Sequence, residues 1–492
     1  MLWAVVAIPA MMGLAAMLPS AKPVRRALLL LGALGHSGMV AWLCVRGVGD
    51  VGDAWIALDA PGELFLAITS ALFLAAAVYA VGYLRKEAGQ ATHDEVEGFL
   101  FYNEPEAVFV GCLLLFLATM SLVCLSQHLG LLWVAVEATT LASAPLISFH
   151  RHHRSLEATW KYLLICSVGI ALALLGIFFL ATAGRGHVHS LTMHSLLSVA
   201  STMDPAWLKA AFILLLVGYG TKMGLAPMHT WLPDAHSESP SIVSALLSGA
   251  LLNCAFLGLL RGHAILTAAG LGHFSGDLLV LFGLLSMGAA AVFLIRQSDY
   301  KRMLAYSSIE HMGILALGVG VGGLAGVGAM LHAVNHSMTK GLLFLAAGNL
   351  LAAYRTKNVQ DVRGLLKVIP ITGCLWVAGF LAITGSPPFG LFLSELTILK
   401  GMLDGGRWAV AVAYLLALGV IFVAMARIIL PMAFGSPPAA MMTDSAAERR
   451  RQPAWAVIPP LALGAVVLVL GLTVPAPLWQ LLRQAAATIG AQ

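Results

Sequence analysis

The sequence predicts an all-α polytopic membrane protein with about 14 transmembrane helices. Hydrophobic residues fill 60% of its 492 positions and charged residues only 10%, and the mean hydropathy is +0.89. Apolar runs of about 18 or more residues recur along the whole chain, which is typical of segments that cross a bilayer. Because backbone groups in lipid must be hydrogen-bonded within their own segment, each run is expected to be a helix.

The apolar runs give the bounds of the predicted helices. In chain order, these cover residues 2–19, 27–45, 64–83, 107–126, 129–149, 157–181, 206–233, 242–260, 278–295, 303–318, 323–353, 368–400, 408–430 and 455–472. The first run has no basic segment ahead of it, so we expect a retained helix rather than a signal peptide. The polar stretches are loop-sized, and the net charge of +5 is spread over them, which does not indicate a nucleic-acid surface.

Basic residues are concentrated in the loops that follow odd-numbered helices. These residues are Lys22, Arg25, Arg26, Arg85, Lys86, Arg151, Arg154, Arg296, Lys301, Arg302, Arg355, Lys357, Arg363, Lys367 and Arg449 to Arg451. The loop after the second helix instead carries Asp50, Asp53, Asp59 and Glu63. The positive-inside rule therefore predicts that the basic loops face the cytoplasm and that both termini lie in the periplasm of a bacterial inner membrane.

Two stretches of the chain repeat each other. Residues 224–234 (GLAPMHTWLPD) align without a gap with residues 385–395 (GSPPFGLFLSE), so that glycine, proline, aromatic and carboxylate coincide. Lys161 with Gly169 likewise matches Lys340 with Gly348. We predict N-terminal helices in 1–100, a five-helix repeat in 101–265, a second repeat in 266–432 and a C-terminal helix in 433–492. An odd number of helices per repeat inverts the second relative to the first.

Each predicted repeat contains one helix with proline near its middle, at Pro227 and at Pro387 and Pro388. Proline removes a backbone donor and clashes with the preceding turn, so both helices are expected to be broken. Non-helical backbone at membrane depth is tolerated only where protein or a water-filled cavity covers it. The two breaks therefore indicate an ion path.

Among the charged residues within the predicted helices, we single out Glu137, Lys161, Lys222, Lys340 and Glu395. Each costs roughly 2.5 to 3.5 kcal/mol at a helix centre unless it is paired or hydrated. A buried lysine gains or loses its proton as a carboxylate approaches or retreats, so glutamate and lysine in facing helices predict a proton relay. The alternative is a set of static buried pairs that fix helix packing.

Histidines add a second possible proton path. His332, His336 and Lys340 recur at i, i+4 and i+8 on one helix face, and imidazole titrates near neutral pH; a hydrogen-bonded core histidine is an equal alternative for His332. The HRHHR stretch at 150–154 allows a metal site, but its place in a basic loop favours a solvated role. Asp234, His236 and Glu238 are expected at the end of a broken helix, where solvated and relay roles are both open.

Cofactor motifs are missing from the sequence. The six cysteines form no CxxC pair, and there is no Walker A or HExxH sequence. We therefore expect no cofactor in this chain and place any redox chemistry on a partner.

Three long stretches carry a family resemblance: GTKMGLAPMHTWLPDAHSESPSIVSALLSGALLNCAFLGLLR, QSDYKRMLAYSSIEHMG and HAVNHSMTKGLLFLAAGN. They resemble the proton-translocating, antiporter-like subunits of respiratory complex I (M, N and L types) and of Mrp-type cation/proton antiporters. VEATTLASA, SLEATWKYLLICSVG and IEHMG are most similar to the hydrogenase-4 component F branch. The similarity covers nearly the whole chain.

The resemblance implies a role for individual residues. Glu137 and Lys222 match the pair thought to gate proton uptake, Lys340 with His336 matches the central axis of the second repeat, and Glu395 matches its terminal residue. Asn253 takes the place of a lysine in the M-type relatives. Because asparagine cannot store a proton, Ser248 or water would have to link Lys222 to Lys340. His229 and Asp234 are further possible linking residues.

The resemblance also implies the setting of the protein. It predicts an ion-translocating subunit among other integral membrane subunits, coupled to a peripheral [NiFe]-hydrogenase-like or formate-oxidising arm that holds the nickel and the iron–sulfur centres. Alternatives are a subunit of a cation/proton antiporter and a membrane subunit that energises inorganic-carbon uptake. The choice between proton and sodium, the direction and the stoichiometry stay open.

Overall fold

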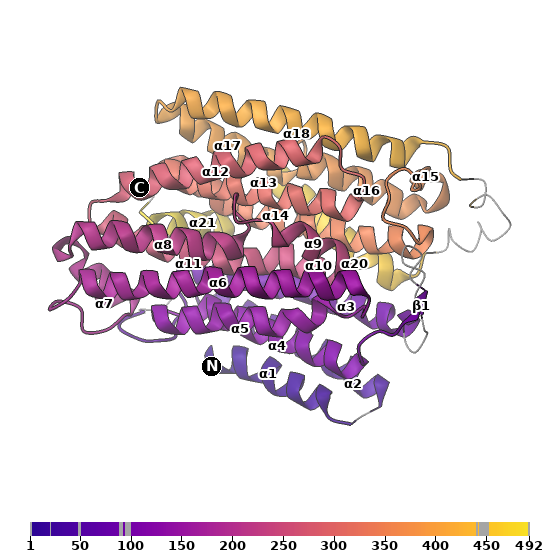
Figure 1. The fold of residues 1–492 in the computed structure, drawn as a ribbon, viewed down its shortest axis with the longest axis horizontal. Helices are drawn as coiled ribbons and strands as arrows, with labels where there is room; N and C mark the ends of the chain where they lie inside the picture. Colours follow the sequence, from indigo (N-terminus) through magenta and orange to yellow (C-terminus); the bar gives the residue numbers. More distant parts are fainter. Residues whose placement is uncertain are drawn as a thin grey trace.

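The structure is a computed structural model that describes residues 2–19, 21–47, 51–87, 92–93, 100–438, 441 and 452–490. Long helices run side by side along one direction (Figure 1). Among the described residues, 11 helices are long and apolar enough to cross a membrane. The fold is therefore that of a multi-pass, all-helical membrane protein.

The helices differ widely in length. They are α1 (Leu2–Met17), α2 (Lys22–Arg46), α3 (Ala60–Glu87), α4 (Glu106–Leu125), α5 (Leu129–Ile147), α6 (His153–Ala183), α7 (Met193–Val199), α8 (Pro205–Met223), α9 (Trp231–Glu238), α10 (Ser241–Leu246), α11 (Leu252–Ala268), α12 (Gly272–Leu294), α13 (Tyr300–Val321), α14 (Gly323–Tyr354), α15 (Leu365–Val368), α16 (Pro370–Ile383), α17 (Gly390–Asp404), α18 (Trp408–Phe434), α20 (Ala454–Leu472) and α21 (Ala476–Thr488). A 3₁₀ turn, η1 (Ala200–Thr202), follows α7, and a π-helical turn, η2 (Leu247–Leu251), joins α10 to α11. Two short strands, β1 (Thr92–His93) and β2 (Leu100–Phe101), pair antiparallel.

Each predicted apolar segment coincides with a helix or with a pair of helices. The two segments with central prolines are interrupted, as α8 with α9 and as α16 with α17. Sequence analysis missed α7 and α21, which are short helices of 7 and 13 residues. The number of membrane crossings stays a prediction, because length and apolarity support 11 of them.

Glycine starts both breaks. Gly224 follows α8 with φ of 83°, and Gly385 follows α16 with φ of 62°, a conformation that only glycine adopts easily. These are the two glycines that the repeat alignment places in register. Side chains satisfy backbone groups that the first break frees, because the Ser286 hydroxyl accepts from the Ala226 N–H at 2.9 Å and the Trp231 Nε1–H donates to the Thr221 carbonyl at 2.9 Å. Inverted repetition of the two units stays a prediction.

The helix α14 lies at the centre of the bundle. It packs against α3, α10, α13, α16, α17, α20 and α21, and nearly all of its side chains are buried. The α10–α11 pair is buried throughout its most apolar window. Outer helices such as α18 expose large apolar side chains, including Leu416 and Phe434, as expected for a surface in contact with lipid.

The described basic loops gather at one end of the bundle, on the right in Figure 1. Arg26 pairs with Glu106 (2.7 Å) beside the end of α3, and Lys357 pairs with Glu238 (2.8 Å). Asp50 and Arg449 to Arg451 lie outside the described residues. The described basic loops thus lie on one side of the protein, as expected from the sequence. That this side faces the cytoplasm stays a prediction.

A buried ion pair stabilises the opposite end. Arg261 on α11 donates to Asp59 (3.1 Å) and to the Gln127 side-chain oxygen (3.0 Å). The side chains of Arg261 and Asp59 are only 4% and 13% exposed. They line a cavity of about 170 Å³ between α3, α7, α11 and α21. This pair therefore ties the N-terminal helices to the first predicted repeat.

Replacing Arg261 by methionine is expected to lower the free energy of unfolding by about 3–5 kcal/mol, because Asp59 would keep a buried charge without its cation. Thermal denaturation of the purified complex in detergent measures this loss. Arg407→Met is the control, since it removes a more exposed ion pair with Asp277 (2.7 Å) and should cost about 1 kcal/mol or less. Equal destabilisation by the two substitutions would contradict the structural role of Arg261.

Candidate functional site

Lys222 lies one residue before the end of α8, at the first break. Its side chain is fully buried. The ammonium group donates to the Thr140 hydroxyl at 2.6 Å and to the Tyr162 hydroxyl at 2.7 Å. Among the described residues, no carboxylate forms an ion pair with it. Lys222 is therefore held by hydroxyl groups of α5 and α6, and the static ion-pair alternative does not describe it.

Glu137 reaches the same hydroxyl from the other side. This half-buried carboxylate on α5 accepts from the Ser167 hydroxyl at 2.7 Å and from the Thr140 hydroxyl at 3.4 Å. Thr140 lies one helical turn after Glu137, so the two side chains share a face of α5. The structure thus joins Glu137 to Lys222 through Thr140. Sequence analysis missed Thr140 and Tyr162, because hydroxyl groups in apolar helices carry no charge signal.

Lys340 forms a second network in the middle of α14. Its buried ammonium group donates to the Leu304 carbonyl at 2.7 Å and to the Ser307 hydroxyl at 2.9 Å, both on α13. Among the described residues it too has no carboxylate ion-pair partner. Glu310 lies one turn beyond Ser307 on α13 and is 2% exposed. Sequence analysis did not single out this buried carboxylate, although it lies within the predicted helix 303–318, where an unpaired charge is costly.

The two predicted linking residues of the eighth segment take different places. Ser248, in the π-helical turn η2, exchanges a hydrogen bond with Ser308 at 2.8 Å, and Ser308 shares the Leu304 carbonyl with Lys340. Asn253 donates to Ser337 on α14 at 2.8 Å. Among the described residues, neither side chain forms a hydrogen bond with Lys222. Ser248 therefore belongs to the Lys340 network.

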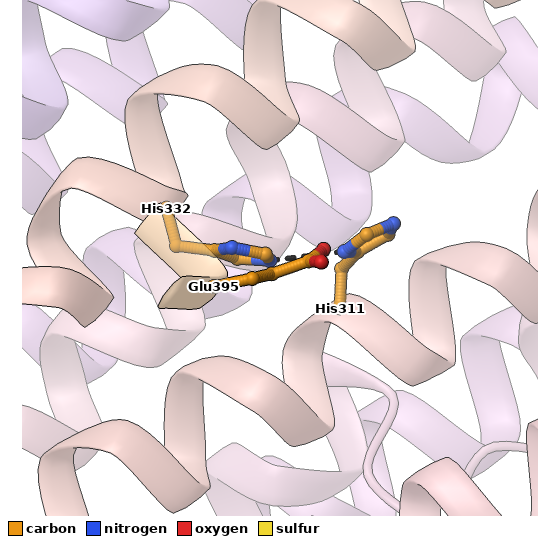
Figure 2. Close-up of side chains that lie close together, drawn as sticks. All are labelled: His311, His332 and Glu395. Atoms are coloured by element: carbon orange, nitrogen blue, oxygen red, sulfur yellow. Dashed lines mark hydrogen bonds between the residues drawn. The ribbon is translucent and has the colours of Figure 1, made fainter. Parts of the chain in front are cut away.

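A hydrogen-bond chain runs from α13 through α14 to α17, and Figure 2 shows its link between His311 and His332. The Ser394 hydroxyl lies 2.9 Å from the Leu391 carbonyl and 3.0 Å from His332 Nδ1. In the arrangement in which Ser394 donates to this carbonyl, His332 Nδ1 donates its proton to Ser394. His332 Nε2 then carries a lone pair and accepts from His311 Nδ1 at 2.9 Å. His332 thus belongs to a hydrogen-bond chain with one donor direction in this arrangement. His311 is a member of the chain that sequence analysis missed.

Buried polar atoms without a protein partner surround this chain. Among the described residues they include both amide atoms of Asn335, both ring nitrogens of His236 and of His336, Glu310 Oε2, Glu395 Oε1 and His311 Nε2. Leaving such a group unsatisfied costs about 1–3 kcal/mol, and buried water is the usual way to satisfy it. The region from α9 to α17 is therefore suited to a hydrated path.

His236 lies inside this region rather than at a solvated end. Its side chain is 0% exposed, and its ring stacks on Phe344 of α14 with centroids 5.0 Å apart. The solvated alternative for His236 is therefore wrong. The break bends the chain so that α9 turns inward and carries His236 against α14, which the sequence could not reveal.

Lys161 is not one of the buried charges. Its side chain is 45% exposed and pairs with Glu157 (2.7 Å) and Asp234 (3.0 Å). The helix α6 begins at His153, so Lys161 lies only about two turns from its polar end. The prediction that Lys161 is buried is wrong, because an apolar run does not reveal where its helix meets the surface. Its role in proton transfer is untested.

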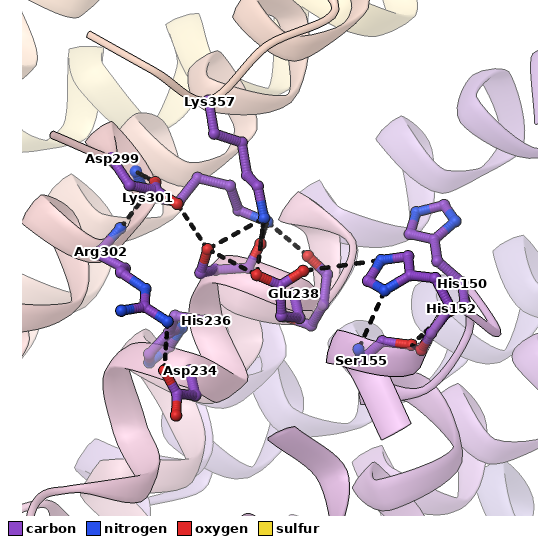
Figure 3. Close-up of polar contacts among 12 residues, drawn as sticks. His150, His152, Ser155, Asp234, His236, Glu238, Asp299, Lys301, Arg302 and Lys357 are labelled. Atoms are coloured by element: carbon purple, nitrogen blue, oxygen red, sulfur yellow. Dashed lines mark hydrogen bonds and ion pairs between the residues drawn. The ribbon is translucent and has the colours of Figure 1, made fainter. Parts of the chain in front are cut away.

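Charged residues form a network at this polar end (Figure 3). Asp234 also pairs with Arg302 (2.5 Å), and Lys301 donates to the carbonyls of Ser237 (3.2 Å) and Ser239 (2.5 Å).

His229 lies apart from this network, with its ring against Phe293 and Tyr306. In the HRHHR loop, His150 bonds Asn103 (2.8 Å) and His152 accepts from the Ser155 N–H (3.0 Å). These contacts favour a structural role for the loop over a metal site.

Glu238 is the central acid of the network, outside the candidate membrane spans. Burial alone would raise the pKa of its carboxyl group, but the ion pair and hydrogen bond with Lys357 and the charges of His152 and Lys301 lower that pKa from 4.5 to about 2. A carboxylate whose pKa is depressed in the folded state stabilises the fold above its unfolded pKa. This stabilisation is lost as the pH falls from about 4.5 toward 2.

Glu238→Gln is therefore expected to lower the melting temperature at pH 7 and to weaken the fall in melting temperature between pH 4.5 and 2. Melting curves of the purified complex over this pH range test both effects. Asp404→Asn, which removes an exposed pair with Lys400 (2.6 Å), should leave both nearly unchanged. An unaltered pH profile for Glu238→Gln would contradict the assigned ion pairing.

Comparison with known proteins identifies the family. The family described as "NADH:quinone oxidoreductase/Mrp antiporter, TM" matches residues 126–421, which contain both lysine networks and the histidine chain. The chain belongs to this family. The antiporter-like subunit is 36% identical to the hydrogenase-4 component F homolog of Methylacidiphilum infernorum (isolate V4) over 398 residues, 79% of this chain and 81% of the relative. It is 31% identical to NADH-quinone oxidoreductase subunit N of Desulforudis audaxviator (strain MP104C) over 409 residues, 81% of this chain and 78% of the relative.

A solved structure supports the fold of the antiporter-like subunit. A chain of the membrane-bound sulfane sulfur reductase, an archaeal respiratory membrane complex, superposes with a TM-score of 0.86 at 22% identity, covering 99% of this chain and 97% of that one. The resemblance read from the sequence is thereby confirmed at the level of family and fold. The subunit is an antiporter-like, multi-pass membrane protein related to hydrogenase-4 component F and to NADH-quinone oxidoreductase subunits.

Proposed function

We propose that this subunit translocates protons across the bacterial cytoplasmic membrane. The observation that supports it is the pair of buried lysines, Lys222 and Lys340. Each is bonded to neutral groups of facing helices, and within the described part of the chain neither forms an ion pair with a carboxylate. A fixed charge at such depth is costly and a static role would call for a counter-ion. A lysine that exchanges its proton avoids a permanent charge.

The first network can load and unload one proton. In the proposed cycle, Lys222 holds the proton while Glu137 is near, and Thr140 carries it between them by accepting one proton and donating its own. When Glu137 moves away, the charged form of Lys222 loses its stabilisation and the proton leaves. The ammonium and the carboxylate thus act as one switch with a hydroxyl between them.

The second network continues the path from Lys340. A proton that reaches His311 at Nε2 allows His311 to pass its Nδ1 proton to His332 Nε2. His332 then passes its own Nδ1 proton to Ser394, which releases its hydroxyl proton to water. Each ring gains one proton and loses one, so the chain resets by reorientation. Water is proposed to connect this chain to Lys340 through Glu310 and His336, and to bridge Lys222 to Lys340 near Asn253 and His236.

We further propose that the subunit serves a complex of the hydrogenase-4 or formate hydrogenlyase type, with two inverted repeats in 101–265 and 266–432 and both termini periplasmic. The relative named as a hydrogenase-4 component F homolog supports this choice. Other integral membrane subunits and a peripheral arm that holds [NiFe] and iron–sulfur centres are the proposed partners. Moving one charge against 100 mV costs about 2.3 kcal/mol, which a modest redox step supplies.

Gentle purification from native membranes tests the proposed complex. We expect a hydrogenase-like large subunit among the co-purifying chains, bound nickel and iron, and proton movement in vesicles when the electron donor is added. A partner set without such a subunit, with sodium-dependent proton exchange, would instead support a cation/proton antiporter. An inorganic-carbon uptake partner would support the third alternative.

A further inference from the structure

Three buried side chains from three helices converge on one point (Figure 2). His311 of α13, His332 of α14 and Glu395 of α17 each offer one ligand atom, and these atoms all lie within 4.8 Å of one another. The exposed fractions are 0%, 0% and 7%. Two imidazole nitrogens and a carboxylate form the donor set of three-ligand zinc sites, which keep a fourth position for water.

We propose that His311, His332 and Glu395 bind a divalent transition-metal cation, Zn²⁺, which closes the proton path. The inference rests on the proposed function, because His311 and His332 lie on the proposed path from Lys340 to Ser394. Zinc would take the His332 Nε2 lone pair and, after the His311 proton moves from Nδ1 to Nε2, the His311 Nδ1 lone pair. The hydrogen bond between the rings would then be replaced by two metal bonds, and no proton could pass.

The surroundings of the site suit a cation. Ser394 accepts the Nδ1 proton of His332 at 3.0 Å and thereby keeps Nε2 free, as outer partners do for metal-binding histidines. Glu395 Oε1 has no protein partner among the described residues. The Glu395 carboxylate lies against Gly385, where a Cβ atom would come within 1.9 Å of Oε2, so the glycine leaves the room that the carboxylate occupies.

Cobalt(II) binding to the purified intact complex tests the site, since Co²⁺ in a His and carboxylate site gives a visible absorption spectrum. We expect one Co²⁺ per copy of this chain beyond any bound by other subunits, and we expect Zn²⁺ to displace it. The affinity for Co²⁺ should fall by about tenfold or more in His311→Gln, His332→Gln and Glu395→Gln. His263→Gln is the matched control, because it removes a buried imidazole that bonds only Ser275 (2.8 Å), and it should bind Co²⁺ normally. Size-exclusion profiles establish that each variant assembles.

Proton translocation by the wild-type complex, measured in metal-free buffer and then with Zn²⁺, separates the two proposals. We expect translocation without metal, inhibition by Zn²⁺ and recovery with a chelator. A complex that translocates protons but gives the same Co²⁺ spectrum in all three variants, or no spectrum, would overturn the metal site alone. A complex that binds Co²⁺ as expected but moves no protons without metal would overturn the proposed function.

Discussion

Replacing Lys222 by methionine is expected to lower redox-driven proton translocation by a factor of about 10² or more, the usual contribution of a positioned proton-transfer group. Methionine has a similar length and no proton to exchange, and it removes a buried ammonium without leaving a buried carboxylate unpaired. The complex should therefore still assemble. Vesicles that contain the complex and a trapped pH-sensitive dye measure the rate of proton movement after addition of the electron donor.

Lys209→Met is the matched control for this experiment. Lys209 lies on the same helix, α8, but its side chain is exposed, over the ring of Phe274. Its replacement should leave translocation within about twofold of the wild type, because exposed charges contribute little. Glu137→Gln should reproduce the loss seen with Lys222→Met. Normal translocation by Lys222→Met would contradict the role of the first network.

Lys340→Met is expected to abolish translocation to a similar extent, again by a factor of about 10². The reason is different, since in the proposed path Lys340 is the group from which the proton passes toward Glu310 and the histidine chain. Serine and carbonyl partners on α13 can reorient around methionine without a buried charge being left behind. The same vesicle measurement applies, with electron-donor oxidation recorded in parallel to report on the partner arm.

For Lys340 the control is Lys400→Met, on the neighbouring helix α17. Lys400 pairs with Asp404 (2.6 Å) at a surface where its side chain is 62% exposed. The complex with Lys400→Met should translocate protons at the wild-type rate. If Lys340→Met retained the wild-type rate, the path would have to bypass the centre of α14, and the assignment of the second network would be wrong.

The apolar runs predicted the helices well, because burial in lipid makes helix formation a property of composition. The two proline breaks were predictable for a different reason, because proline interrupts a helix through its own backbone and needs no tertiary contact to do so. The missed helices α7 and α21 are short, and no long apolar run marks them. Length and apolarity thus reveal the spans and say little about the segments between them.

Sequence analysis singled out the charges that stand in apolar runs at Glu137, Lys222, Lys340 and Glu395, but it overlooked Glu310, which also stands in one. The neutral groups that connect these charges were not predicted. Thr140 joins Glu137 to Lys222 only because α5 and α8 meet at that level, which is a tertiary fact. Lys161 shows the converse error, since a lysine within an apolar run lies at the surface when its helix ends nearby. The inward turn of α9 that buries His236 likewise depends on packing against α14.

The most direct test of proton transfer through the buried lysines is a double variant, Lys222→Met with Lys340→Met, in the intact complex. Redox-driven acidification or alkalinisation of vesicles and electron-donor oxidation are measured together, the latter also with an uncoupler present. We predict assembled complex, electron transfer that persists with the uncoupler, and no proton movement above the leak. Proton movement at the wild-type ratio to electrons in this double variant would contradict the account.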